Sequence, residues 1–148
     1  MSSIEESVEV AVPLTSAYAQ WARFEDFPRF MDGVRHIERH SPALTYWVTE
    51  FGGVRREFEA KVTDRRPDDR IAWRTVRGDV RQSGVVTFHR VDDTHTEVMV
   101  QMDHDPGRVT DIVADRLGLV RRQIRGDLGR FKAYMEEAFA EERGVASA

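Results

Sequence analysis

Residues 108–142 read RVTDIVADRLGLVRRQIRGDLGRFKAYMEEAFAEE, and their apolar side chains return every three or four positions. This spacing places them on one stripe of an α-helix, with charged residues on the opposite face. An unbroken helix of this length would extend about 50 Å, and we expect a bend or break at Gly118. The stripe consists of Ile112, Val113, Leu117, Val120, Ile124, Leu128, Phe131, Met135 and Phe139.

The segments before this helix alternate apolar and polar residues with a period of two, as β-strands do. Short turn sequences separate them, such as Gly52-Gly53 and Gly78-Asp79. Connections this short cannot hold a parallel crossover, so the pattern predicts an antiparallel meander. The predicted strands cover residues 4–12, 34–40, 44–51, 54–64, 70–76, 80–90 and 95–104.

Two short helices are predicted between the first and second strands. Pro13 ends the first strand, and Thr15 or Ser16 is suited to cap a helix over residues 17–22. Residues 24–31 then form an irregular helical turn that contains three phenylalanines and a proline.

These elements predict an α+β fold, because a sheet and a helix that are each apolar on one side bury one another when the sheet curves around the helix. We expect a curved antiparallel seven-stranded sheet around a long C-terminal helix, in a single domain over residues 1–143 with a tail at 144–148. The volume between sheet and helix is the default ligand site, since ligand pockets are concave and mostly apolar.

Six short motifs occur in order along nearly the whole chain. They are Val12-Pro13, Tyr18-Ala19-Gln20-Trp21, residues 24–31 (FEDFPRFM), residues 70–74 (RIAWR), residues 84–88 (GVVTF) with Thr94 and Thr96, and residues 127–132 (DLGRFK).

With these motifs the chain resembles the START-like (SRPBCC) superfamily, which has the Bet v 1-type helix-grip fold. More narrowly, it is similar to the polyketide cyclase/dehydrase-like branch, which is related to coenzyme Q-binding proteins. The resemblance implies an internal cavity for a hydrophobic molecule, where a few polar groups steer ring closure of a reactive polyketone.

Composition excludes several other classes of protein. The absence of cysteine rules out disulfides and thiol chemistry and fits a cytoplasmic location. Neither a signal peptide nor a transmembrane segment is visible, and a formal net charge of −4 argues against a nucleic-acid partner. The histidines lack zinc-site spacing and no glycine-rich phosphate loop occurs, so we expect no metal and no cofactor.

The predicted cavity is lined by the inward-facing residues of the strands, by the helical turn at residues 24–31 and by the apolar stripe of the C-terminal helix. An arginine is predicted near its opening. An aromatic wall of this kind stacks a flat ligand, although Trp73 is equally well interpreted as an ordinary core tryptophan. The predicted ligand-binding residues are Phe30, Met31, Val48, Phe58, Trp73, Phe88, Val98, Met102, Ile112, Val113, Arg116 and Val120.

Three polar residues are candidates for catalysis. His104 shares its parity with Met102 and would act as a general acid or base near the cavity mouth, or simply end a strand. Glu50 and Arg56 flank the Gly52-Gly53 hairpin and are predicted to face the cavity as a pair, the alternative being a salt bridge on the rim.

A basic cluster, RRQIR at residues 121–125, interrupts the otherwise mixed helix. It permits contact with RNA or an anionic membrane, but a solvated face of mixed charge is favoured because glutamates follow on the same helix.

Two functions remain open at this point, together with a weaker one. The chain binds a small hydrophobic molecule and either catalyses its cyclisation or dehydration, or carries a lipid or quinone unchanged. The weaker hypothesis is a protein-interaction module that uses the basic cluster. The protein is expected to be a monomer or a homodimer.

Overall fold

The computed structural model describes the backbone of residues 2–51, 53–105 and 113–142, without the side chains of residues 2, 51, 104, 105, 113–119, 141 and 142. The elements follow one another as β1 (Ser2–Val10), α1 (Leu14–Trp21), the 3-10 helix η1 (Phe24–Arg29), β2 (Val34–Arg39), β3 (Leu44–Phe51), β4 (Val54–Arg66), β5 (Arg70–Gly78), β6 (Arg81–Asp92), β7 (His95–Asp105) and α2 (Val113–Glu142).

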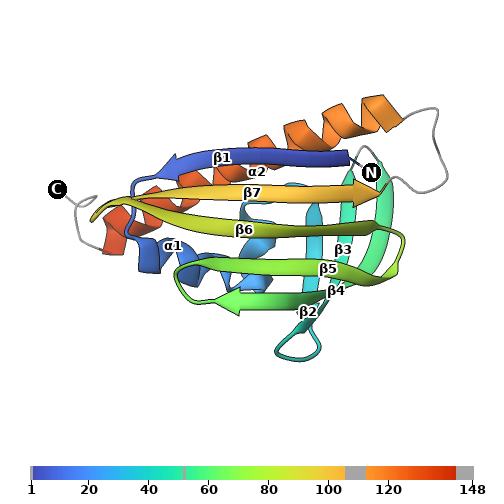
Figure 1. Ribbon diagram of the computed structural model, residues 1–148, viewed down its shortest axis with the longest axis horizontal. Helices are drawn as coiled ribbons and strands as arrows, with labels where there is room; N and C mark the ends of the chain where they lie inside the picture. The colour runs from blue at the N-terminus through green and yellow to red at the C-terminus, as the bar shows by residue number, and fades with distance from the viewer. Residues whose placement is uncertain (1, 52, 106–112, 143–148) are drawn as a thin grey trace.

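The strands form one seven-stranded antiparallel sheet in the order β1-β7-β6-β5-β4-β3-β2. Strands that follow one another along the chain are neighbours, except that β1 joins the sheet beside β7. The sheet curls strongly, so that β2 and β3 run across the direction of β1 and β7, and β4 bends from the one direction into the other (Figure 1). The predicted α+β helix-grip architecture is therefore confirmed.

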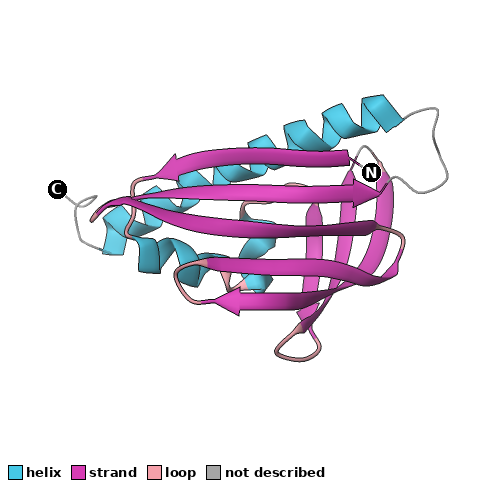
Figure 2. Ribbon diagram, viewed as in Figure 1, coloured by secondary structure: helices cyan, strands magenta, loops and turns pink. Residues whose placement is uncertain are grey.

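Helix α2 lies along β1 on one face of the sheet, and the two short helices are drawn beside its C-terminal half (Figure 2). Its direction follows from two contacts with β1 and the residue just after it. Arg125 Nε donates to Glu6 Oε1 at 2.6 Å, and further along the helix Glu136 Oε2 accepts from the Ala11 N–H at 2.8 Å. The N-terminal part of α2 therefore lies at the end of the sheet where β1 begins, which we call the distal end.

The distal end is also where β7 ends and where the β5–β6 hairpin turns. Ser2 pairs with His104, Gln82 pairs with the same residue, and Gly78 pairs with Phe58 on β4. The opposite end, which we call the α1 end, holds α1, η1 and the β6–β7 hairpin (Figure 1).

Two predictions about helices are wrong. Helix α1 begins at Leu14, and no side chain caps it; instead the Pro13 carbonyl accepts hydrogen bonds from the Ser16 and Ala17 N–H groups, both at 3.1 Å. Helix α2 is continuous from Val113 to Glu142, so it does not break at Gly118. One interior glycine costs a helix only about 1 kcal/mol, and the contacts along the rest of this helix outweigh that cost.

Candidate functional site

The α1 end of the interior is filled by aromatic side chains. Phe131 of α2 is fully buried, with its ring centroid 5.0 Å from that of Trp21 and 5.2 Å from that of Phe30. Phe88 on β6 completes this group through an edge contact with Trp21 at 6.4 Å. Edge-to-face pairs of this kind are favourable, so this half is a packed core. The predicted ligand residues Phe30, Met31, Phe88 and Val98 belong to it or pack against it.

The distal half of the concave face has a different lining, namely three aromatic rings on neighbouring strands. Trp47 on β3 stacks on Phe58 of β4, with centroids 5.7 Å apart and planes 13° apart. Trp73 follows on β5, and both tryptophans remain partly exposed. Both tryptophans pack with one side against the core, where the Trp47 centroid lies 5.7 Å from that of Phe27, and their partial exposure leaves the rest of each ring uncovered.

The absence of a side chain at Gly84 explains the position of the Trp73 indole ring. The two residues pair across β5 and β6, and Gly84 pairs in turn with Met102 on β7. A Cβ atom added at Gly84 would meet Trp73 Cζ2 at 2.7 Å. The missing side chain therefore lets the indole lie against β6, where it forms a flat wall.

Polar groups at the distal end are mostly satisfied by neighbours. The Trp47 Nε1–H donates to Thr45 Oγ1 at 2.7 Å, and the Thr45 hydroxyl donates to the Ala60 carbonyl. Arg56 is the exception: it is half-buried, pairs in register with the buried Thr49, and makes no ion pair with the described side chains. Its guanidinium is therefore available to an oxygen of a bound molecule.

The helix completes this half with Val120 and Ile124, both partly buried. Next to them is an acidic group that sequence reasoning missed. Asp127 Oδ1 accepts from Gln123 Nε2 at 3.0 Å and from Arg130 Nη2 at 2.5 Å. Burial raises the pKa of Asp127 although Arg130, Gln123 and the Asp32 N–H oppose that shift.

Arg130 ties this group to the segment between η1 and β2. Its Nε donates to the Phe30 carbonyl at 3.0 Å, and its Nη1 lies 3.4 Å from Asp32 Oδ2. The cluster of Asp127, Arg130 and Asp32 thus holds one flank of α2 against the chain that precedes β2.

The other flank of α2 carries the basic cluster of residues 121–125. Arg125 and Arg121 both contact Glu6, at 2.6 Å and 3.9 Å. Glu6 has the same parity on β1 as the buried Ile4 and Val10, so it faces inward and its side chain is only 14% exposed. Two of the three arginines therefore attach the helix to β1 while remaining exposed, and Arg122 is exposed without an ion pair to the described side chains.

The predicted pair of Glu50 and Arg56 does not form. A two-residue turn makes Glu50 pair with Arg55 and Thr49 with Arg56, so the two candidates lie on opposite faces of the sheet. Glu50 instead lies 3.5 Å from Arg35 on β2. Val48 pairs with Glu57, so it too faces away from Phe58, although it is buried.

Four further predicted residues lie outside what the structure describes. His104 belongs to β7, but its side chain is not among those described, and the same holds for Val113 and Arg116 on α2. Ile112 lies outside the described residues altogether. Trp73 and Met102 are brought together by their common partner Gly84, and Phe58 on β4 and the partly buried Val120 on α2 are the other described residues of this prediction.

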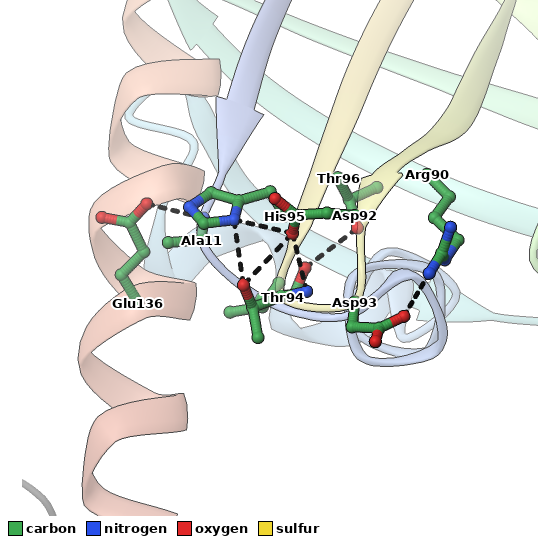
Figure 3. A network of polar contacts seen from close by, with 9 residues as sticks. Ala11, Arg90, Asp92, Asp93, Thr94, His95, Thr96 and Glu136 are labelled. Carbon is green, nitrogen blue, oxygen red and sulfur yellow. Dashed lines mark hydrogen bonds and ion pairs between the residues drawn. The ribbon is translucent and has the colours of Figure 1, made fainter.

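The polar network at the β6–β7 hairpin belongs to a turn at the opposite end. Asp92 Oδ1 accepts from the Thr94 N–H and lies near His95 Nδ1, both at 2.9 Å (Figure 3). These contacts, the Thr94 N–H first, hold the pKa of Asp92 below its ordinary value. Among the described residues, no three His, Asp or Glu side chains gather in a way that would hold a metal ion.

Comparison with known proteins identifies the family. Residues 10–133 match the family model described as polyketide cyclase / dehydrase and lipid transport. The chain belongs to this family. Its description covers two kinds of activity on hydrophobic molecules, and the fold is that of the START-like superfamily. None of the described helices has an apolar stretch long enough to cross a membrane.

Three relatives illustrate how far similarity within this family extends. An uncharacterized 17.2 kDa protein from the melC2-rnhH intergenic region of Streptomyces lincolnensis is 55% identical over 144 residues, covering 97% of this chain and 96% of that protein. A solved structure from Deinococcus radiodurans is 26% identical with a TM-score of 0.72 and covers 93% of this chain and 99% of its own. The Zhui aromatase/cyclase of a Streptomyces species has a TM-score of 0.79 at 15% identity and covers 91% and 93%, which shows the shared fold alone.

Proposed function

We propose that this protein binds a flat, largely apolar small molecule between the distal half of the sheet and α2. The observation that supports this most directly is the aromatic wall on the inner face, which consists of the partly exposed Trp73 and Trp47 and the buried Phe58. The other half of the interior is already filled by the cluster around Phe131. Membership of the cyclase/dehydrase and lipid-transport family is consistent with such a ligand.

Replacing Trp73 tests the wall. The change Trp73→Leu keeps an apolar residue beside Gly84 but removes the stacking surface, which is worth about 0.5–1.5 kcal/mol beyond area burial. We therefore expect roughly tenfold weaker binding of a flat hydrophobic compound, measured by fluorescence competition with the neutral dye Nile red.

Trp21→Phe is the matched control, because Trp21 belongs to the filled α1 end. This variant should lose stability and keep its affinity. Equal affinity in the Trp73 variant and the wild type would place the ligand elsewhere. Native mass spectra of gently purified protein, followed by denaturation, would show which compound is bound.

Cyclisation or dehydration of a polyketide is the second candidate function, and Arg56 is the observation that favours it. A half-buried guanidinium without an ion-pair partner among the described side chains can stabilise the negative charge that develops on a carbonyl oxygen during enolisation. Losing one such preorganised donor costs enzymes about a hundredfold in rate.

The change Arg56→Gln separates the two candidates. An enzyme should lose about a hundredfold in turnover of a linear poly-β-ketone, followed by mass spectrometry as the formation of a product one water lighter, while affinity changes little. A carrier returns the ligand unchanged in both proteins. Wild-type turnover that the substitution leaves intact would remove Arg56 from the chemistry.

A further inference from the structure

A polar pair follows the aromatic stack on the inner face of β3 and β4. Trp47 lies opposite Phe58, and the next inward-facing positions along the two strands are Thr49 and Arg56, which also lie opposite one another. Residues two apart on a strand are separated by about 7 Å, a distance that a bicyclic aromatic molecule spans. A flat molecule that rests on Trp47 and Phe58 therefore reaches the polar pair with one end.

Thr49 contributes a hydroxyl group that is not enclosed. The residue as a whole is only 4% exposed, with Val34 of β2 on one side and Arg56 on the other. Its hydroxyl makes no hydrogen bond with a described residue. Among the described residues, Tyr18 Oη is the only side-chain polar atom that is both fully enclosed and without a partner. The Thr49 oxygen therefore borders open space, and it can donate a hydrogen bond to a group that enters the interior.

Arg56 lacks a counter-ion because the neighbouring carboxylates lie on the other face of the sheet. Glu57 and Glu50 point outward, where Glu57 is 3.4 Å from Arg55 and Glu50 is 3.5 Å from Arg35. Arg56 faces inward and makes no ion pair with the described side chains. A half-buried cation without a counter-ion is unfavourable, and an anion at this position removes that cost.

The polar pair lies at the rim of the inner face. On the side away from β3, the pairing of β4 with β5 starts at Phe58, which lies opposite Gly78, and β5 ends at that glycine. Arg56 lies beyond this pair, so no other described strand flanks it. A charged group bound at the rim keeps part of its hydration, which lowers the cost of bringing it out of water.

We infer that Thr49 and Arg56 recognise a carboxylate, and that the ligand is a flat aromatic acid. The Arg56 guanidinium presents a planar fork of donors that matches both carboxylate oxygens, and the Thr49 hydroxyl donates to one of them. The aromatic part of the ligand lies on Trp47 and Phe58. The position of the rings rests on the proposed function, and the carboxylate is a charge that the ligand carries before any reaction. An enolate, by contrast, carries its charge only during the reaction.

The compounds 2-naphthoate and 2-naphthamide test this, because they have the same shape and differ in charge. Competition with Nile red at pH 7 gives the affinity of each compound. Wild type should bind naphthoate about tenfold more tightly than the amide, as hydrogen bonds between charged groups imply. Arg56→Gln should bind the two compounds equally, and Thr49→Val should reduce the preference for naphthoate by about fivefold.

Arg55→Gln is the matched control. It removes the same charge one residue away, but on the outer face beside Glu57. This variant should keep the wild-type preference for naphthoate. An equal loss of preference in the Arg55 and Arg56 variants would mean that net charge alone attracts the acid, and it would overturn the site.

The Nε–H signal of Arg56 in ¹⁵N–¹H spectra separates this inference from the proposed pocket. Naphthoate should shift that signal, which is assigned from its absence in Arg56→Gln, and naphthamide should not. Displacement of Nile red by both compounds with equal affinity would contradict the aromatic acid and leave the pocket standing. A shift at Arg56 without displacement of the dye would refute the stacking on Trp47 and Phe58 and leave the carboxylate contact. Neither a shift nor displacement would overturn both.

Discussion

The contact between Gly84 and Trp73 is the residue-scale feature on which the aromatic wall depends. A methyl group at position 84 would lie 2.7 Å from Trp73 Cζ2 and 2.9 Å from the Gln101 carbonyl oxygen. The carbonyl belongs to the sheet and cannot move easily, so the indole must turn away. The shape of the candidate site therefore depends on a residue that has no side chain.

The change Gly84→Ala should lower the free energy of unfolding by about 1–3 kcal/mol, as overpacking does. Urea unfolding measures this, and the tryptophan emission of the folded state should shift because Trp73 is displaced. Gly129→Ala is the control: nothing lies within 4 Å of that position on α2, so this variant should gain about 0.5–1 kcal/mol. Equal stability of both variants would contradict the close packing of Trp73.

Sequence patterns located the strands but not every face. Glu50 and Arg56 are predicted on the same face because Glu50 shares its parity with Val48 and Arg56 shares its parity with Phe58. The turn pairs Phe51 with Val54, which fixes Glu50 opposite Arg55. Since side chains alternate with a period of two, an error of one residue in register moves a side chain to the other face. Alternation along one strand does not say which residues of the two strands are paired across the turn. The relative faces of Glu50 and Arg56 therefore could not be predicted from it.

At the scale of elements, α2 is held along both flanks by charged groups. Arg121 and Arg125 hold it to Glu6 of β1, and Arg130 holds it to the segment before β2. Toward its C-terminal end Glu136 accepts from Lys132 at 2.5 Å and from the Ala11 N–H. Burial would raise the pKa of Glu136, but these hydrogen bonds outweigh it and the pKa lies below its ordinary value.

Asp127 should make stability depend on pH in the direction opposite to most carboxylates. Because burial raises its pKa, the folded protein keeps a proton on Asp127 where the unfolded chain has released it. Its contribution to the unfolding free energy therefore falls as pH rises from about 4, where an unfolded aspartate ionises, up to the raised pKa. Asparagine cannot ionise, so Asp127→Asn removes this fall.

Urea unfolding across the acid range measures the effect. The stability difference between Asp127→Asn and wild type should grow in favour of the variant above about pH 4 and then become level. Asp69→Asn, at an exposed turn position, is the control and should follow the wild-type profile. A constant difference for Asp127→Asn would mean that its pKa is not raised by folding.

The sequence predicts which helices and strands exist better than it predicts the residues at which they begin and end. The limits of β3 agree with the prediction, and β4 and β5 extend two residues beyond it. Helix α1 begins earlier because Pro13 can start it without a side-chain cap. Strand lengths depend on partners across the sheet, which a local pattern does not contain.

At the scale of the whole molecule, the interior is divided into a filled half and a half lined by partly exposed rings. The sequence places apolar residues in both halves, so pattern alone could not separate the buried Phe30 and Phe88 from the partly exposed Trp73. The difference arises from α1 and η1, whose aromatic side chains insert beside Phe131 at one end only. Assignment of the chain to one domain stays a prediction.

The pairing of β1 with β7 has a consequence for how the chain is made. Val8 lies opposite Val98, so the strand synthesised first must wait for a partner that is translated about 90 residues later. At roughly 5–20 residues per second, this delay is several seconds or more. During that time the apolar face of β1 has neither its neighbouring strand nor α2, which comes later still. A nascent chain of this protein on the ribosome therefore exposes an apolar, aggregation-prone N-terminal segment, to which chaperones can bind.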